Sequence, residues 1–246
     1  MQVIALKGLP LVRQGDDIGE MVVHAAEKHG VHIKNGDVVV VAQSILSKAE
    51  GNVVDLRAVK PGQLARRLAK RLSKDSREVE VVLKQSKEIV RLGHVIISRT
   101  KHGFVCANAG VDHSNIEPEH VTLLPDDPDA SAERIRSTIR RAMGADVAVI
   151  VSDTQGRPFR LGVTGVAIGI AGMLPLLDLR GRRDLYGNEM EVTITSPADA
   201  LAAAAVAVMG EADEATPVVV IKGAAYKRGQ GSVRELLMPT ELDLFR

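Results

Sequence analysis

The chain has 246 residues, enough for one large domain or two smaller ones, and its formal net charge is only +1. It has no tryptophan, three phenylalanines and two tyrosines among 45% hydrophobic residues, which predicts an aliphatic core. Few aromatic side chains and a balanced charge argue against a general binder of single-stranded nucleic acid or other polyanions. A single cysteine, Cys106, excludes an internal disulfide, and no signal peptide or long apolar span is visible. We therefore expect a soluble protein of the cytoplasm.

The first half of the chain predicts strands and helices in mixed order. The predicted elements are a strand at 3–6, a helix from Asp16 or Asp17 to Gly30, a strand at 37–41, helices from Pro61 and at 76–85, and a hairpin of 95–98 with 103–106. The buried strand 37–41 leads into a polar segment that ends at Gly51 and contains Ser44 and Lys48. The helix after Pro61 is expected to bury Leu64, Leu68 and Leu72. Its cations Arg66, Arg67, Lys70 and Arg71 form either a solvated face or a nucleic-acid face.

The second half continues in the same mixed manner. The predicted elements are a linker at 125–129, a helix at 131–143, strands at 147–151 and 163–170, a basic loop at 178–187, a strand at 191–195, a helix from Ser196 to Met209, an acidic turn at 210–214, a strand at 218–221 and a flexible loop at 229–232. Strands and helices do not alternate regularly. We therefore predict an α+β fold with mixed sheets and flanking helices rather than a doubly wound one.

The best candidate for chemistry follows the apolar strand 147–151. Ser152, Asp153 and Thr154 are expected at the end of that strand, where a rigid sheet fixes side chains that the next loop leaves accessible. Asp153 and Thr154 offer adjacent hard oxygens, and Arg157 and Arg160 follow as cations. This combination suits a metal-bound phosphate, although Asp153 alone is equally compatible with capping a turn.

Three oxygen-rich loops contain the other candidate ligands. Asp112 lies in one of them, Asp153 with Thr154 in the second, and Glu211 in the third. If these carboxylates converge, a hard divalent cation such as Mg²⁺ or Mn²⁺ must separate their charges; otherwise the loops are simply solvated. Lys48 is the candidate cation for phosphate, against the alternative of an ordinary exposed lysine.

Common nucleotide, zinc and hydrolase motifs are missing from the sequence. It contains no P-loop, no GxGxxG that links a strand to a helix, and no GxSxG elbow. One cysteine and seven histidines without HExxH spacing disfavour a zinc site, and Cys106 is expected to be a core thiol. A nucleotide site would therefore need a less common architecture.

Six short motifs taken together resemble the coenzyme F-420:γ-glutamyl ligases, the archaeal GTP-dependent enzymes, over nearly the whole chain. The motifs, in chain order, are Gly8-Leu9-Pro10-Leu11, Ser47-Lys48-Ala49-Glu50-Gly51, the run from Asn108 to Asn115, the run from Ser152 to Arg157, Asp184-Leu185-Tyr186-Gly187 and Met209-Gly210-Glu211. The resemblance implies a γ-glutamyl ligase-like fold in which residues 1–246 form a single ligase domain, with the possibility of two intertwined subdomains.

The resemblance also implies a reaction. Such enzymes use GTP to add L-glutamate to the lactyl-phosphate end of a deazaflavin coenzyme precursor, then extend the product through a γ-linkage and release GDP and phosphate. The family is homodimeric, uses Mg²⁺ or Mn²⁺ and is helped by K⁺. Transfer of the γ-phosphoryl group to the terminal carboxylate would give an acyl phosphate that the glutamate amine attacks.

Carried over position by position, the resemblance implies a set of site residues. The metal ligands would be Asp112, Asp153, Thr154 and Glu211. The catalytic residues would be Lys48 and Asp153. The nucleotide would be held by Gly8, Leu9, Pro10, Leu11, Ser44, Lys48, Asn115, Met209, Gly210, Glu211, Ala212, Asp213, Glu214, Ala215 and Thr216. The chain departs from the family at Gln43-Ser44, where a Ser-Thr pair is usual, and at 210–214, which is less rich in glycine.

Three alternatives to this ligase remain open at the level of sequence. The first is a ligase of the same architecture that acts on another acidic acceptor. The second is a regulatory module that binds GTP and metal without chemistry. The third is an RNA-binding role for the cations of 66–71, which predicts an affinity that falls steeply with salt. The sequence does not predict how many glutamates are added or which metal is preferred. It also does not predict which residues bind the coenzyme precursor and glutamate, or the dimer geometry.

Overall fold

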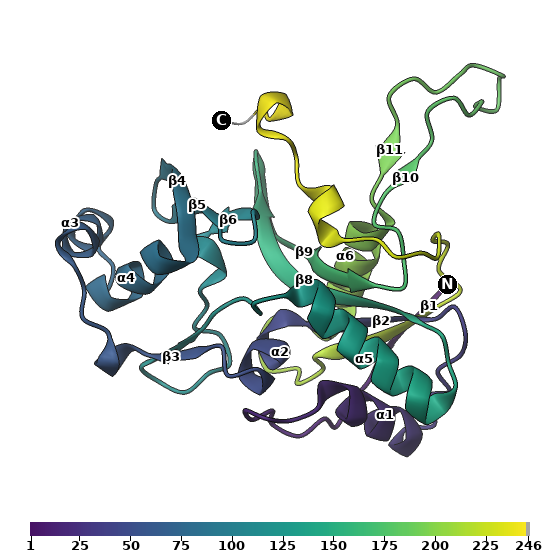
Figure 1. Ribbon diagram of the computed structural model, residues 1–246, viewed down its shortest axis with the longest axis horizontal. Helices are drawn as coiled ribbons and strands as arrows, with labels where there is room; N and C mark the ends of the chain where they lie inside the picture. The colour runs from purple at the N-terminus through teal and green to yellow at the C-terminus, as the bar shows by residue number, and fades with distance from the viewer. Residues whose placement is uncertain (245–246) are drawn as a thin grey trace.

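A mixed sheet forms the centre of the molecule in the computed structural model, which describes residues 1–244 (Figure 1). Its five strands, in spatial order, are β1 (Gln2–Ala5), β12 (Val218–Lys222), β2 (Val38–Ala42), β8 (Ala148–Arg157) and β9 (Arg160–Ala171). Only β2 and β8 run parallel, and every other neighbouring pair is antiparallel. The predicted α+β class with mixed sheets is therefore confirmed.

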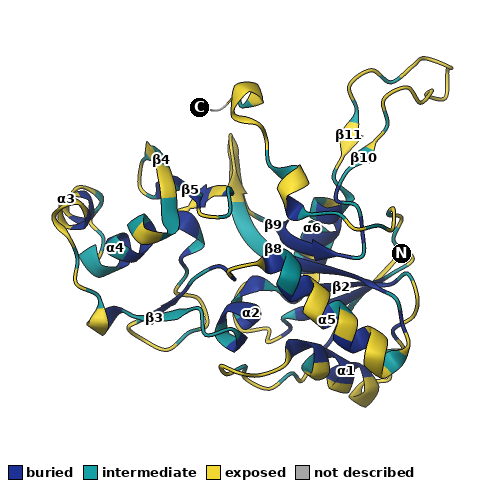
Figure 2. Cartoon of the chain, viewed as in Figure 1, coloured by how far each residue is buried: buried dark blue, intermediate teal, exposed yellow. Residues whose placement is uncertain are grey.

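Helices bury both faces of this sheet, which explains its uninterrupted β-branched runs. Val39 and Val41 pack with α1 (Ile18–Lys28) and α5 (Pro128–Met143), whereas Val38 and Val40 pack with α6 (Pro197–Met209) on the other face. The strands are buried and the outer faces of α1 and α5 are exposed (Figure 2). Each helix begins at a polar cap: Asp17, Asp127 and Ser196 accept hydrogen bonds from backbone N–H groups in the first turn.

The edge strand β9 is held between the N-terminal turns of α5 and α6. The Asp129 carboxylate accepts a hydrogen bond from the Ile170 backbone N–H at 2.7 Å, and Asp199 accepts one from the Ala167 N–H at 2.9 Å. A Cβ atom at Gly165 would lie 2.5 Å from the carbonyl oxygen of Ala202, so the glycine permits this close approach. The edge of the sheet is thus covered by helices over this stretch.

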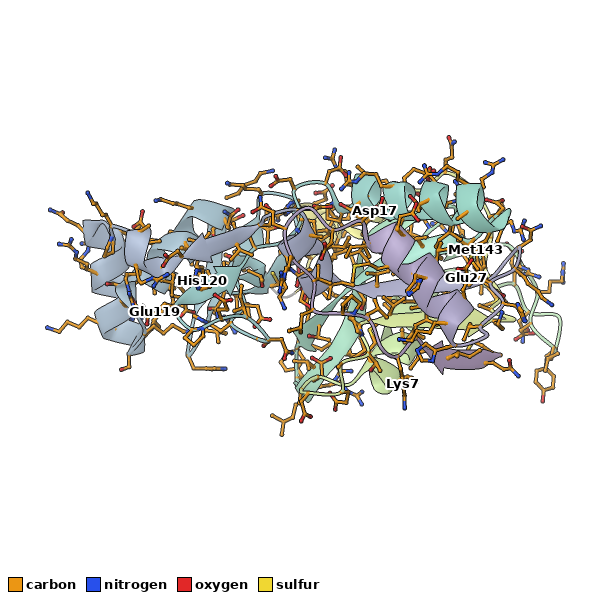
Figure 3. All side chains as sticks on the ribbon, turned by 90° about the horizontal axis from the view of Figure 1, so that it is seen from below. Lys7, Asp17, Glu27, Glu119, His120 and Met143 are labelled. Carbon is orange, nitrogen blue, oxygen red and sulfur yellow. The ribbon has the colours of Figure 1, made fainter. Side chains whose placement is uncertain are left out.

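A smaller lobe with its own apolar core lies at one end of the molecule. It contains β3 (Val53–Asp55), the 3₁₀ turns η1 (Leu56–Ala58) and η2 (Asn108–Gly110), α3 (Gln63–Leu72), α4 (Ser76–Gln85), β4 (Ser86–Leu92), β5 (Ile96–Thr100), β6 (Val105–Ala107) and β7 (His120–Thr122). Figure 3 shows Glu119 and His120 of this lobe at one end and Glu27 and Met143 at the other. The division into two intertwined subdomains stays a prediction.

Two further segments project from the central sheet or cross it. An arm between β10 (Leu177–Asp178) and β11 (Ile194–Thr195) extends away from the rest of the molecule (Figure 1). The C-terminal segment carries the 3₁₀ turns η3 (Val233–Leu236) and η4 (Thr240–Leu242). None of the helices in residues 1–244 is both long and apolar enough to cross a membrane.

Several predicted elements differ from the structure. The polar segment after β2 is a helix, α2 (Gln43–Ala49), because its buried side pairs Gln43 and Ser47 with a backbone carbonyl. The loop predicted at 229–232 is confirmed as irregular; the 3₁₀ turn at Val233–Leu236, which was not predicted, begins directly after it, where Ser232 and Glu235 form a capping box. The predicted strand 191–195 is reduced to Ile194–Thr195 because the arm has no sheet to join. Strands β3, β4 and β7 were not predicted.

Two other corrections concern single side chains. Asp153 does not lie at the end of a strand: β8 continues to Arg157 because it pairs with β9 as a long hairpin. Leu64 is 48% exposed rather than buried, because α3 packs through Ala65, Leu68 and Ala69.

Candidate functional site

The predicted site segments meet at one edge of the central sheet because of its topology. Strands β2 and β8 are parallel and pair Ala42 with Ser152, so helix α2, which follows β2, and the part of β8 from Asp153 onward lie at the same edge. Strand β12 is antiparallel to β2, so the loop 209–216 that precedes it begins at this edge. Strand β1 is antiparallel to β12, which brings the loop 8–11 there as well. Four segments distant in sequence therefore converge.

Asp153 lies at the centre of this convergence. It is half-buried on β8 opposite Val166 of β9, and its Oδ2 accepts a hydrogen bond from Gln155 Nε2 at 3.0 Å. Burial raises the pKa of the Asp153 carboxyl to about 6, and the negative charges of Asp112 and Glu211 raise it further in the same direction. Asp112 and Glu211, from the other two acidic loops, are therefore close enough to act electrostatically on Asp153.

The neighbouring residue Thr154 links β8 to the loop that follows α6. Its hydroxyl donates a hydrogen bond to Glu211 Oε2 at 3.2 Å. Burial raises the pKa of Glu211, and the charge of Asp112 also raises it. Repulsion between like charges is the electrostatic signature expected of a site built to hold a cation.

Asp112 is fixed by its own loop. Its Oδ1 accepts hydrogen bonds from the Ser114 backbone N–H at 3.1 Å and from the Ser114 hydroxyl at 2.8 Å. Its backbone exchanges hydrogen bonds with Thr122 at 3.1 and 2.8 Å. The small lobe therefore supplies one of the three carboxylates, and the central sheet and its loops supply the other two.

The donor set suits a hard divalent cation in its chemistry. Three carboxylates and one hydroxyl offer oxygen ligands. Burial first, and neighbouring negative charge second, raise the pKa values of Asp153 and Glu211, and a bound cation would oppose both effects. Within residues 1–244, however, no three His, Cys, Asp or Glu side chains are positioned to hold one ion together. Closing the ligand set around a cation therefore requires these side chains to move together.

Lys48 reaches the site from α2, which is oriented by its opposite side. Gln43 Nε2 and the Ser47 hydroxyl donate to the Leu123 carbonyl at 3.0 and 2.5 Å. Ser44 and Lys48 lie four residues apart, one turn from each other on a different face. Burial lowers the pKa of Lys48, and the charge of Asp112 opposes this effect. Lys48 is therefore a cation held near the acidic loops.

Asn115 connects three of the predicted nucleotide segments. Its carbonyl accepts a hydrogen bond from Lys48 Nζ, and its Nδ2 donates to the Ala212 carbonyl at 3.0 Å. The loop from Met209 is closed by Thr216, whose hydroxyl donates to the Met209 carbonyl at 2.7 Å. Loop 112–115, helix α2 and loop 209–216 thus form one side of the site.

The other predicted nucleotide residues lie on the rim. Gly210, Ala212, Asp213, Glu214 and Ala215 belong to the loop before β12, and Glu214 Oε2 accepts from the Ala212 N–H at 2.8 Å. In the loop after β1, Leu9 packs against the core, whereas Gly8, Pro10 and Leu11 are exposed. No contact in the structure assigns these residues to a nucleotide, so their role stays a prediction.

The chain is similar to known proteins over its whole length. A model of the F420-0:γ-glutamyl ligase family matches residues 8–223. The chain belongs to this family. It is 50% identical over 249 aligned positions to the coenzyme F420:L-glutamate ligase of Methanothermobacter thermautotrophicus, covering 100% of this chain and 99% of that protein. Proteins of the same name from Methanopyrus kandleri and Haloarcula marismortui are 46% and 40% identical, over 96% and 100% of this chain and 93% and 96% of their own lengths. The predicted identity as a carbon–nitrogen ligase is thereby confirmed.

Some residues that shape this ligase site were not predicted from sequence. Gln155 bonds to Asp153, and it shares a face with Asp153 because β8 continues past the predicted strand end. Ser114 donates a hydrogen bond to Asp112 within a turn. The Asp-x-Ser spacing is typical of such a turn and is visible in the sequence. Cys106 is buried, and its pKa is raised to about 12 by burial first and the Asp153 charge second. The core-thiol prediction therefore agrees with its surroundings.

Proposed function

We propose that this member of the ligase family uses GTP to join L-glutamate to the terminal carboxylate of a deazaflavin coenzyme F420 precursor. The first glutamate is added through an amide and the next through a γ-linkage, with release of GDP and phosphate. The names of the relatives, coenzyme F420:L-glutamate ligases, support the acceptor and the amino acid. The observation that carries the GTP and metal dependence is the convergence of Asp112, Asp153 and Glu211 on the edge reached by Lys48.

The reaction needs an activated carboxylate, because a carboxylate oxygen is a poor leaving group. A carboxylate oxygen of the acceptor attacks the γ-phosphorus of GTP, the bond to the β-phosphate oxygen breaks, and GDP leaves. The glutamate amine then attacks the acyl carbon of the resulting acyl phosphate. Loss of a proton from nitrogen and departure of phosphate complete the amide. Both steps depend on positioning and on neutralising phosphate charge rather than on a covalent nucleophile of the protein.

The acidic residues and Lys48 divide this work. Asp112, Asp153, Thr154 and Glu211 would hold Mg²⁺ or Mn²⁺, which neutralises phosphate oxygens when bound. Lys48, desolvated beside Asp112, places a fixed positive charge against the transferred phosphoryl group. Asn115 ties Lys48 to the loop 209–216, so the backbone that would border the nucleotide is fixed relative to that charge.

Three further parts of the proposal extend beyond the site. A homodimer is supported by the arm, whose exposed apolar residues Leu185, Tyr186 and Val192 have no core of their own to cover. A reducing compartment such as the cytoplasm is compatible with the single buried thiol. Activation by K⁺ rests on the family resemblance, and comparing equal concentrations of KCl and NaCl tests it.

A four-component omission assay tests the proposal. Purified protein should form GDP and a mono- or diglutamylated coenzyme, detected by mass spectrometry, only when precursor, glutamate, GTP and divalent metal are all present. Asp153→Asn should abolish this turnover, whereas Glu27→Gln, which removes one negative charge from the exposed face of α1, should retain it. GTP hydrolysis that ignores glutamate and acceptor, or full activity in Asp153→Asn, would overturn the assignment.

A further inference from the structure

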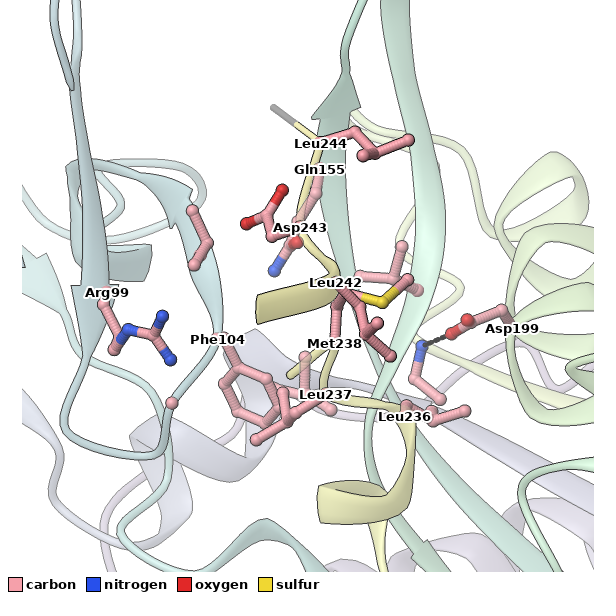
Figure 4. A pocket seen from close by; sticks show the side chains of 15 residues that line it. Arg99, Phe104, Gln155, Asp199, Leu236, Leu237, Met238, Leu242, Asp243 and Leu244 are labelled. Atoms are coloured by element: carbon pink, nitrogen blue, oxygen red, sulfur yellow. Dashed lines mark hydrogen bonds between the residues drawn. The ribbon is translucent and has the colours of Figure 1, made fainter. Parts of the chain in front are cut away.

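A cavity lies next to Asp153, and its lining residues are distinct from the nucleotide segments. It has a volume of about 370 Å³ and is bordered by the β5–β6 hairpin, by β8 and β9, and by the C-terminal segment (Figure 4). This volume is in the range of small-molecule sites, roughly 300–1,000 Å³. None of the proposed nucleotide or metal residues lines it.

The cavity borders the acidic site through two residues of the central sheet. Gln155 lines the cavity and donates its side-chain hydrogen bond to Asp153 Oδ2 at 3.0 Å. Val166, which also lines the cavity, is the cross-strand partner of Asp153. A molecule in the cavity would therefore need to extend only past Gln155 to bring one end to Asp153.

The walls are mostly apolar. They are formed by aliphatic residues of β9 and of the C-terminal segment, with Phe104 on the side of the small lobe (Figure 4). Met238, Leu242 and Leu244 line the cavity yet remain 62%, 61% and 90% exposed. A bound apolar group would remove part of this surface from water, which favours binding.

The polar side chains that line the cavity are those of Arg99, Gln155, Asp199 and Asp243, and they differ in their availability. Asp199 is engaged, because it accepts the hydrogen bond of the Ala167 N–H at 2.9 Å. Arg99 is the one cation among the lining residues; it contacts Glu88 at 3.3 Å and the Thr240 hydroxyl at 3.3 Å. These contacts are long, and Glu88 is half exposed, so a more strongly charged anion would compete for the guanidinium.

We infer that this cavity binds the ring system of the acceptor, with Arg99 meeting the acceptor's phosphate and the acceptor's terminal carboxylate lying past Gln155 at Asp153. The inference rests on the proposed function, because it assumes an acceptor that joins a flat ring to an anionic tail. It divides the molecule at Asp153: phosphates of the nucleotide are held on the side of Lys48, and the acceptor is held on the side of the C-terminal segment.

Calorimetric titrations of the full chain test this assignment with three ligands: the deazaflavin precursor, the same molecule without its lactyl-phosphate group, and GTP. Met238→Trp inserts a bulky ring from an exposed position, and it should weaken both deazaflavin ligands by on the order of tenfold or more. Arg99→Met should weaken only the phosphate-bearing precursor, by roughly tenfold. GTP affinity should be unchanged in both variants.

Matched controls separate these effects from general damage. Leu64→Trp places the same ring on the exposed side of α3, and Arg91→Met removes an exposed cation from the neighbouring strand β4; both should bind like the wild type. Unchanged deazaflavin affinity in Met238→Trp and Arg99→Met would overturn the cavity assignment alone. Loss of GTP affinity instead would assign the cavity to the guanine base and also overturn it. If the wild type binds neither deazaflavin ligand, the proposed function fails, and the inference fails with it.

Discussion

Removing the negative charge of Asp153 should stabilise the metal-free protein while it abolishes turnover. Burial raises the pKa of this carboxyl from its usual 3.8 to about 6. At ~1.36 kcal/mol per unit, the ionised carboxylate costs the folded state about 3 kcal/mol. Because the pKa is raised by folding, the cost is absent below about pH 4, grows as pH rises and is complete above about pH 6.

Thermal unfolding in EDTA at constant ionic strength, from pH 4 to pH 8, measures this effect. Asp153→Asn should melt well above the wild type at pH 8, by roughly 5–10 °C for a chain of this size, and the two should converge toward pH 4. The asparagine oxygen retains an acceptor for the Gln155 amide, so the hydrogen bond at this position need not be lost. Addition of Mn²⁺ or Mg²⁺ at pH 8 should raise the melting temperature of the wild type and leave that of the variant nearly unchanged.

A matched control is Glu27→Gln, which removes one negative charge from the exposed face of α1. Its stability should stay within about 0.5 kcal/mol of the wild type at every pH. The reasoning fails if Asp153→Asn is less stable than the wild type in EDTA at pH 8. It also fails if the gap between the two does not depend on pH.

Four other changes give separable outcomes. Lys48→Met should lower kcat/KM for GTP by roughly 10²–10³, measured as GDP release, because a fixed charge against the phosphoryl group is lost. Thr154→Val removes the hydroxyl bonded to Glu211 and should weaken Mn²⁺ binding about tenfold by calorimetry. The Cys106 thiol, with its pKa near 12, should resist a thiol-reactive dye at pH 8 until the chain is unfolded. Gly165→Ala should cost ~1–3 kcal/mol in urea unfolding, because the new methyl group meets α6.

Much of the fold was readable because local signals and tertiary packing agree. The helix at 76–85 was predicted with its observed bounds, since its apolar residues recur on one face, and in the structure Asp75 caps it. The helix after Ser196 was equally clear, because a proline directly after a capping serine is typical of the first turn of a helix. The unbroken valine run of β2 was clear as well, because such a run is typical of a strand buried on both faces.

The errors occur where packing overrides the local pattern. Leu64 has the right spacing to be buried, but the small residues Ala65 and Ala69 bring α3 close to its neighbour and turn Leu64 outward. The end of β8 was placed too early because apolar residues stop at Val151, whereas pairing with β9 continues as a half-exposed hairpin to Arg157. Backbone pairing needs no apolar side chain, so composition alone could not reveal it.

The site illustrates the same limit in a different way. The sequence identifies residue types suited to a cation and a phosphate, but nothing local says that Asp112, Asp153 and Glu211 meet. The approach of Asp153 and Glu211 depends on the strand order β1-β12-β2-β8-β9 and on the single parallel pair in it. Asp112 comes near them from the small lobe, so the arrangement is a property of the whole chain. The same pairing explains the place of Gln155: once β8 continues beyond Asp153, every second side chain returns to the face of Asp153. The strand that positions the acidic centre therefore also forms one wall of the adjoining cavity, so one strand places Asp153 within reach of both the proposed acceptor cavity and the proposed nucleotide segments.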